Sequence, residues 1–279
     1  MATTETVKAR TLLAECSAEF AGTFILILFG VGVVAQVVAG GIGNHDSIAW
    51  AWGIGVTMGV YVSARISGAH INPAVTIALA AFRGFAWRKV LPYIGAQFLG
   101  AFAAALVVRW NYNAVLEKFD PGLTIKSQGV FSTLPGNGSV ELGVGVWGGF
   151  LDQIIGTAIL MLVILAIVDL RNTAPAANLG PFMIGLLVVG IGMAWGTLAG
   201  YAINPARDFG PRLASAITGY GGQAFKDQFG DLYFWVPIAG PIIGALIGAL
   251  LYDLLVGRNL PVGDADEEVG RVPDEESAA

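Results

Sequence analysis

An unusual stretch, SGAHINPA at residues 67–74, interrupts an otherwise apolar sequence, and its last three letters return within GYAINPARD at residues 200–208. In both stretches an asparagine precedes a proline, which is a helix-start signal. The asparagine side chain caps free backbone amides, and proline at the first helical position already has the required φ. Two helices are therefore predicted to begin at Pro73 and Pro205. A helix N-terminus inside a membrane is a partial positive charge with unsatisfied N–H donors, so this pair of signals favours a site for a polar solute.

The composition indicates a membrane protein. Of the 279 residues, 55% are hydrophobic and only 13% are charged, and the mean hydropathy is +0.69. A soluble domain carries about 25% charged residues. The net charge is −5 and no basic patch is present, which argues against a nucleic-acid partner. The last residues of the chain form an acidic segment, which is expected to be disordered and solvated.

Neither a cofactor nor a metal site is predicted. The chain has one cysteine, Cys16, which excludes an internal disulfide and a cysteine-based metal site. Its two histidines do not have the spacing of a zinc-binding pair. An intramembrane enzyme is disfavoured, because no Ser/His pair, Asp dyad or His-Glu-x-x-His motif lies on the apolar segments at a working spacing.

Six membrane spans are predicted, since a span needs about 20 apolar residues. They cover residues 11–38, 47–65, 88–109, 149–169, 179–199 and 232–256. The two Asn-Pro-Ala stretches lie between spans two and three and between spans five and six. The apolar run after the first of them is about ten residues long, which gives about 15 Å of helix, or half of a bilayer core. Each stretch is therefore expected to carry a re-entrant half-helix.

The two halves of the chain can be aligned with each other. The segment GTFIL at residues 22–26 matches GTAIL at residues 156–160, and each precedes its Asn-Pro-Ala stretch by a similar distance. Each half has three spans and one half-helix. Because three is odd, the second copy enters the membrane upside down, as in the inverted repeats of transporters. The predicted fold is all-α, with six transmembrane helices and two re-entrant half-helices.

The predicted organisation has three parts. Residues 1–10 form an N-terminal segment, 11–256 form a channel domain with repeats at about 11–110 and 146–256, and 257–279 form the acidic tail. An even number of spans puts both termini on one side. Nine Lys and Arg fall on that side and six on the other, which favours cytoplasmic termini. The long polar segment 111–141 is then extracellular.

Inversion is expected to bring the two half-helices together, N-terminus to N-terminus. The amides of Asn72 and Asn204 would then donate into one passage at mid-membrane, and the two dipole ends would repel cations and protons. The backbone before each asparagine is expected to be extended. Its carbonyls are tolerated at that depth only if they line a wet path. The carbonyls expected to accept from solute hydroxyls are those of Gly68, Ala69, His70, Ile71, Gly200, Tyr201, Ala202 and Ile203.

Three further polar residues lie within the predicted membrane region. Arg207, one turn past Asn204, costs at least about 2.5–3.5 kcal/mol there. It is interpreted as a donor at a constriction, with an ion pair to Asp208 as the alternative. Glu19 and its repeat equivalent Gln153 are expected to accept hydrogen bonds from the amides of the two bent loops.

These residues resemble the major intrinsic protein family, and within it the aquaglyceroporins and glycerol facilitators. The resemblance runs from about residue 18 to residue 260, and the stretches 67–77 and 200–212 are highly specific to it. It implies an aquaporin-like right-handed bundle and a homotetramer with one pore per subunit. It also implies a multi-pass protein of the plasma membrane.

The resemblance further implies a selectivity filter made of Trp52, Gly192, Tyr201 and Arg207. In water-selective members a histidine at the place of Gly192 narrows the pore. The glycine here implies room for glycerol, whose carbon backbone would lie against Trp52 and Tyr201. The residues that match markers of the glycerol-type members are Tyr112, Asp208, Arg212, Pro237 and Ile238.

Two positions depart from the family pattern. Tyr201 stands where bacterial-type glycerol facilitators commonly have phenylalanine, and Gln153 replaces a carboxylate. The sequence predicts a passive channel for glycerol, water and small neutral solutes such as polyols or urea. A water-selective channel of the same fold and an ion-coupled secondary transporter are the alternatives. The tyrosine leaves the ratio of water to glycerol permeation open.

Overall fold

The computed structural model describes residues 11–261 and confirms the predicted fold class. Its long helices, each apolar and long enough to cross a membrane, are α1 (Leu12–Val38), α2 (His45–Ser67), α4 (Trp87–Asn111), α7 (Val146–Val168), α8 (Gly180–Ala199) and α10 (Val236–Leu255). Two shorter helices follow the Asn-Pro signals, namely α3 (Pro73–Phe82) and α9 (Pro205–Ser215). The predicted segment 1–10 and most of the predicted tail lie outside the described residues.

The last long helix begins later than the sequence predicts, at Val236 instead of residue 232. The residues before it are bonded elsewhere. Leu232 forms an isolated antiparallel bridge with Lys226, and the amides of Tyr233 and Phe234 both donate to Phe225 O. Hydropathy alone does not reveal this connection, because residues 232–235 are aliphatic or aromatic and lead directly into the apolar helix.

The predicted polar loop 111–141 contains short helices that the sequence reasoning missed. These are α5 (Asn113–Phe119), α6 (Ile125–Gln128) and the 3-10 turn η1 (Pro135–Gly138). Asp120 organises the first part, because its carboxylate accepts bonds from the amides and hydroxyls of Thr124 and Ser127. Burial by itself raises the pKa of Asp120, but these hydrogen bonds outweigh it and lower the pKa below the ordinary value. Further short turns are η2 (Ala216–Tyr220), η3 (Gly221–Phe225) and η4 (Gly257–Asn259).

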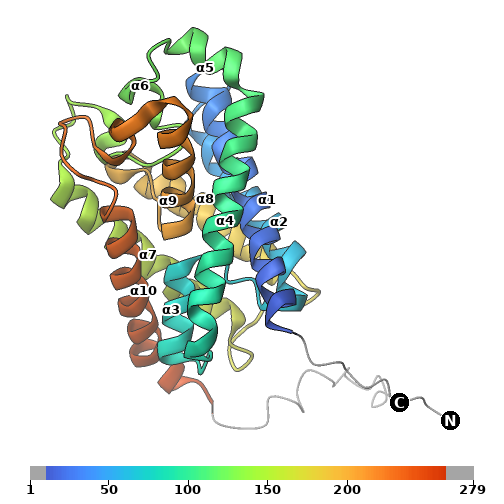
Figure 1. The fold of residues 1–279 in the computed structure, drawn as a ribbon. Helices are drawn as coiled ribbons and strands as arrows, with labels where there is room; N and C mark the ends of the chain where they lie inside the picture. The colour runs from blue at the N-terminus through green and yellow to red at the C-terminus, as the bar shows by residue number, and fades with distance from the viewer. Residues whose placement is uncertain (1–10, 262–279) are drawn as a thin grey trace, which may run out of the picture.

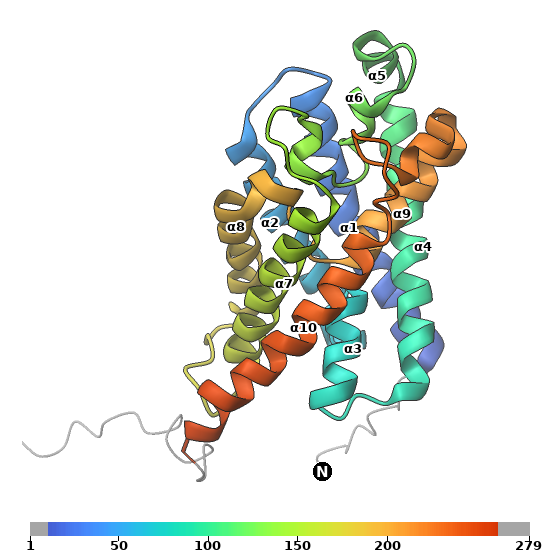
Figure 2. The same ribbon diagram turned by 90° about the vertical axis from the view of Figure 1, so that its left-hand side faces the viewer.

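The helices pack as two equivalent halves. In the first half α1 packs against α2 and α4, and in the second half α7 packs against α8 and α10. Each half-helix packs against the last long helix of the other half, α3 against α10 and α9 against α4. Figures 1 and 2 show α3 and α9 entering from opposite ends of the bundle and meeting near its middle. We call the end where the described chain begins and ends the terminal face, and the end that carries α5 and α6 the far face.

The same close helix contact occurs in both halves. A Cβ atom at Gly100 on α4 would lie 2.4 Å from Phe20 O on α1, and one at Gly244 on α10 would lie 2.3 Å from Ile154 O on α7. Phe20 and Ile154 occupy equivalent positions in the two repeats. Only glycine permits this approach of one backbone to another, which explains the matched glycines.

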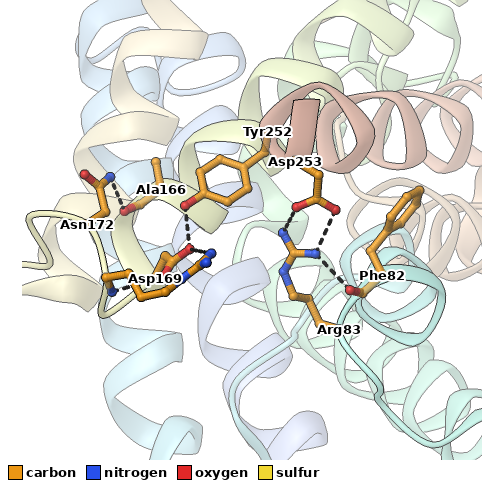
Figure 3. Close-up of polar contacts among 8 residues, drawn as sticks. Phe82, Arg83, Ala166, Asp169, Asn172, Tyr252 and Asp253 are labelled. Atoms are coloured by element: carbon orange, nitrogen blue, oxygen red, sulfur yellow. Dashed lines mark hydrogen bonds and ion pairs between the residues drawn. The ribbon is translucent and has the colours of Figure 1, made fainter. Parts of the chain in front are cut away.

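At the terminal face two segments are tied to the end of α10 (Figure 3). Arg83, just past α3, donates to Asp253 Oδ2 at 3.0 Å and to Phe82 O at 2.8 Å. Asp169, just past α7, accepts a hydrogen bond of 2.8 Å from the hydroxyl of Tyr252. The tip of the first half-helix and the α7–α8 connection are thereby held by one helix.

The Asp169 carboxylate gives this tie a pH dependence. A hydrogen bond from Arg171, with a further one from Tyr252, holds the pKa of Asp169 well below its ordinary value of 3.8. A carboxyl with a depressed pKa stabilises the fold above its unfolded pKa, and this contribution is lost as the pH falls through the folded pKa. We therefore expect Asp169→Asn to lower the thermal unfolding temperature at neutral pH and to flatten the acid-induced decrease below about pH 4. Unfolding scans in detergent from pH 7 downwards, with the exposed Asp46→Asn as control, measure this. A curve for Asp169→Asn parallel to that of the wild type would contradict it.

Candidate functional site

The two half-helices begin as their sequences predict. Asn72 caps α3, with its Oδ1 accepting from the amide of Ala74 at 2.9 Å. Asn204 caps α9, with its Oδ1 accepting from the amides of Ala206 at 3.0 Å and Arg207 at 3.2 Å. Each helix starts with proline, whose missing N–H removes one of the donors that a helix start leaves unsatisfied. Local chemistry therefore fixes both helix starts.

The side-chain amides of the two asparagines bond across the repeats. Asn72 Nδ2 donates to Ile203 O at 2.8 Å, and Asn204 Nδ2 donates to Ile71 O at 2.8 Å. A primary amide has two hydrogens, so each asparagine keeps one for another acceptor. The carbonyls of Ile71 and Ile203, expected to accept from solute, each already accept one bond. One lone pair on each remains.

The backbone before each asparagine is not extended, so that expectation was wrong. Positive φ angles recur at matched positions, at Gly68, Ala69 and Ile71 in the first loop and at Gly200, Tyr201 and Ile203 in the second. A left-handed conformation costs a non-glycine residue about 1–2 kcal/mol. Both loops therefore need strong support from the surrounding helices, and sequence pattern alone does not show this strain.

Glu19 on α1 provides that support for the first loop. Its Oε1 accepts from Ser67 Oγ at 2.6 Å and from the amide of His70 at 2.9 Å. Its Oε2 accepts from the amide of Ile71 at 2.7 Å and from Gln97 Nε2 at 2.8 Å. The side chain is fully buried, so these four donors replace water around the carboxylate. Sequence reasoning did not identify Ser67 and Gln97 as partners of Glu19. The only indication in the sequence is that each is a polar residue within an apolar helix.

Gln153 on α7 holds the second loop with different chemistry. Its Oε1 accepts from the amide of Ile203 at 2.8 Å, and its Nε2 donates to Ala199 O at 2.8 Å. Of the two groups that Gln153 binds, the amide of Ile203 needs an acceptor and the carbonyl of Ala199 needs a donor. A glutamine satisfies both partners, whereas an ionised carboxylate satisfies only the amide.

A cavity of about 410 Å³ runs along both loops. The loops contribute Asn72, Asn204 and residues that include all the predicted carbonyl positions except Gly200 to the lining. The helices contribute mostly aliphatic side chains, such as Val56, Leu160 and Val188. We call the loop part of the lining the polar wall and the helical part the apolar wall; together they suit a solute that carries hydroxyls on a carbon backbone.

Trp52, Tyr201 and Arg207 line this cavity together. The guanidinium carbon of Arg207 lies 3.9 Å from the centre of the Trp52 ring, in cation–π contact. Within residues 11–261 that guanidinium makes no hydrogen bond. Asp208 instead pairs with Arg212 at 2.8 Å, so the alternative of an Arg207–Asp208 ion pair was wrong. The guanidinium of Arg207 therefore lies at the cavity without an ion pair among the described residues.

Gly192 does not line the cavity as expected. A Cβ atom there would lie 2.8 Å from Tyr201 Cζ and 3.1 Å from Tyr201 Oη. The space that the glycine leaves is filled by the phenol ring of Tyr201 and is not open to a solute. The hydroxyl of Tyr201 and the Nε1 of Trp52 are both buried and have no hydrogen-bond partner in the described chain.

The residues that match markers of the glycerol-type members do not line the cavity. Asp208 Oδ2 accepts from the amide and hydroxyl of Thr133, both at 2.7 Å, and Arg212 donates to Thr133 O at 2.9 Å. The pair Asp208–Arg212 therefore ties α9 to the segment 111–141. Tyr112 joins α4 to α5, whereas Pro237 and Ile238 form the first turn of α10 and are not part of the cavity wall.

The comparisons with known proteins agree with this geometry. The family model described as "Major intrinsic protein" matches residues 6–252. The "Glycerol uptake facilitator protein" of Pseudomonas aeruginosa is 44% identical over 92% of this chain and 94% of its own. The "Probable aquaglyceroporin-2" of Gibberella zeae is 44% identical over 87% of this chain and 72% of its own. The X-ray structure of the aquaglyceroporin from Plasmodium falciparum is similar with a TM-score of 0.78 and 33% identity, covering 88% of this chain and 97% of that one.

Proposed function

Because the chain belongs to the major intrinsic protein family, we propose that it is a passive membrane channel for glycerol, water and other small neutral solutes such as polyols or urea. The observation that carries this proposal is the cavity with one polar and one apolar wall. Relatives named for glycerol uptake support the choice of solute. The chemistry of the channel is selection and not reaction, so we propose no enzymatic activity.

The polar wall supplies acceptors and donors in a continuous series. Loop carbonyls accept from the hydroxyls of the solute, while Asn72, Asn204 and Arg207 donate to them. The aliphatic side chains of the apolar wall contact the carbon atoms of the solute. The carbon atoms of glycerol need no polar partner, whereas an ion needs polar groups on all sides. Each hydroxyl exchanges one partner for the next, so no large desolvation step arises along the path.

The same wall disfavours ions and protons. Two helix N-termini converge at the centre, and the cation Arg207 lies nearby. Among the described residues no carboxylate lines the cavity, so no opposite charge offsets the repulsion of a cation by the helix N-termini and Arg207. The two alternatives stay distinct: a water-selective channel would reject glycerol, and a coupled transporter would need a driving ion.

We extend the proposal to the arrangement in the membrane. The channel domain comprises residues 11–256, with both termini in the cytoplasm of a cell whose plasma membrane holds the protein. In this orientation the terminal face is cytoplasmic and the far face is extracellular. A homotetramer with one pore per subunit follows from membership of the family. Protease protection of tagged termini in intact cells tests the orientation.

Stopped-flow light scattering of proteoliposomes in a glycerol gradient tests the function. We expect glycerol entry well above that of empty liposomes, unaffected by dissipating proton and sodium gradients. Glycerol entry no faster than in empty liposomes would refute the proposal. Entry that stops when an ion gradient is removed would favour the coupled transporter.

A matched pair of substitutions on α7 shows whether the flux passes through this cavity. Leu160 lines the cavity and is buried, whereas Leu151 on the same helix is 57% exposed on the outer surface. We expect Leu160→Trp to reduce glycerol permeability per channel by about tenfold or more, a loss that a barrier rise of about 1.4 kcal/mol produces. Leu151→Trp should leave it unchanged. Equal permeabilities in the two variants would place the path elsewhere.

A further inference from the structure

His45, the first residue of α2, packs against α8 near the far face. Its Nε2 lies 2.9 Å from Gly192 O. A Cβ atom at Gly196, one turn further along α8, would lie 2.4 Å from His45 Cε1. The imidazole therefore fills the groove that Gly196 leaves open. Because a carbonyl only accepts, Nε2 of the histidine must carry the donated proton.

The ring of Tyr201 rests on the same two glycines. Positions for a Cβ atom at Gly192 and Gly196 lie 2.8 Å and 3.5 Å from the Tyr201 ring. The rings of His45 and Tyr201 meet edge to face, with centroids 6.4 Å apart and an interplanar angle of 84°. Such pairs are favourable beyond the area that they bury. His45 and the backbone of α8 thus form two sides of a seat for the phenol ring.

No hydrogen bond to residues 11–261 anchors the side chain of Tyr201. The hydroxyl of Tyr201 is buried without a hydrogen-bond partner. The ring lines the cavity together with Trp52 and Arg207, so its position sets how much space remains there. A phenol ring held only by packing moves when one wall of its seat is removed.

We propose that His45 is a positioning residue that holds Tyr201 against Gly192 and Gly196 and thereby sets the size limit for solutes at the Trp52–Tyr201–Arg207 end of the cavity. The inference rests on the proposed function, because it concerns the solute path of that channel. It adds a determinant of specificity that lies on the helix surface and does not touch the solute. Removal of the imidazole opens space beside the ring and lets it leave the cavity.

The test is the ratio of erythritol to glycerol permeability in proteoliposomes. A ratio of two solutes through the same channels does not depend on how much protein folds. We expect His45→Ala to raise the ratio about threefold or more relative to the wild type. His45→Gln, which keeps an N–H donor for Gly192 O, should return the ratio toward the wild-type value, and Asp46→Asn on the same turn should not change it.

A double substitution separates positioning from general loosening of the fold. In a Tyr201→Ala background His45→Ala should no longer alter the ratio, because the ring that it positions is absent. The inference is overturned if His45→Ala leaves the ratio as in the wild type, or if it shifts the ratio equally with and without Tyr201. A wild-type protein that conducts no glycerol would refute the proposed function itself, which these ratios do not address.

Discussion

Replacing Gly192 by histidine should reduce glycerol permeability about a hundredfold while water permeability falls less than about tenfold. A Cβ atom at this position would lie 2.8 Å from the ring of Tyr201, so the ring has to leave its seat. The displaced phenol and the new imidazole then both occupy the end of the cavity beside Arg207. Water passes a narrower opening than glycerol does, which is why the two losses should differ. Stopped-flow measurements in osmotic and glycerol gradients give both values.

Alanine substitutions at two glycines of α8 provide the control. A Cβ atom at Gly190 would meet nothing within 4 Å, whereas at Gly192 it meets the Tyr201 ring. Gly190→Ala should therefore leave glycerol permeability unchanged and Gly192→Ala should lower it. The size argument fails if Gly192→His reduces water and glycerol permeability by the same factor.

Glu19→Gln should destabilise the fold by about 1–3 kcal/mol, although it changes only one atom of the side chain. Both carboxylate oxygens accept two hydrogen bonds each from buried donors. Glutamine has one oxygen, so in either orientation its NH2 group would face a backbone amide, of His70 or Ile71, which cannot become an acceptor. Donors that lose their acceptor in a buried site cost about 1–3 kcal/mol each. A decrease in the thermal unfolding temperature in detergent measures this loss.

The second repeat gives the reciprocal control. Gln153 accepts one bond and donates one, so Gln153→Glu should also destabilise the fold, because the bond to Ala199 O is lost and a buried carboxylate oxygen then faces that carbonyl. Glu141→Gln, on the exposed part of the segment 111–141, should have no effect. If Glu19→Gln and the wild type unfold at the same temperature, the carboxylate does not hold the loop.

Local chemistry made part of this structure predictable. The helix starts at Pro73 and Pro205 follow from neighbouring residues, and the six spans follow from the length of apolar runs. The alignment of the two halves gave their inverted packing, because equivalent sequences form equivalent contacts. None of these inferences needs a contact between residues far apart in the chain.

The parts that sequence reasoning missed depend on distant contacts. The site beside Gly192 is filled by a ring nine positions later and bounded by His45, 147 positions earlier. The sequence pointed to Gly192, but the space beside this glycine was predicted to be open to the solute, whereas the ring of Tyr201 fills it. Likewise Asp208 has two cations nearby in sequence, and only the helical turn shows that Arg212 at i+4 is its partner.

The reciprocal bonds from Asn72 to Ile203 O and from Asn204 to Ile71 O have a consequence for the order of assembly. They join residues 131 and 133 positions apart, so neither can form until the second half of the chain has been synthesised and inserted. The first re-entrant loop therefore waits with a buried carbonyl and amide unpaired, a state that hydrocarbon penalises. Closure of such long loops is slow. Docking of the two halves therefore comes late in biogenesis, and in a chain truncated before residue 203 the amide of Asn72 has no acceptor across the repeats.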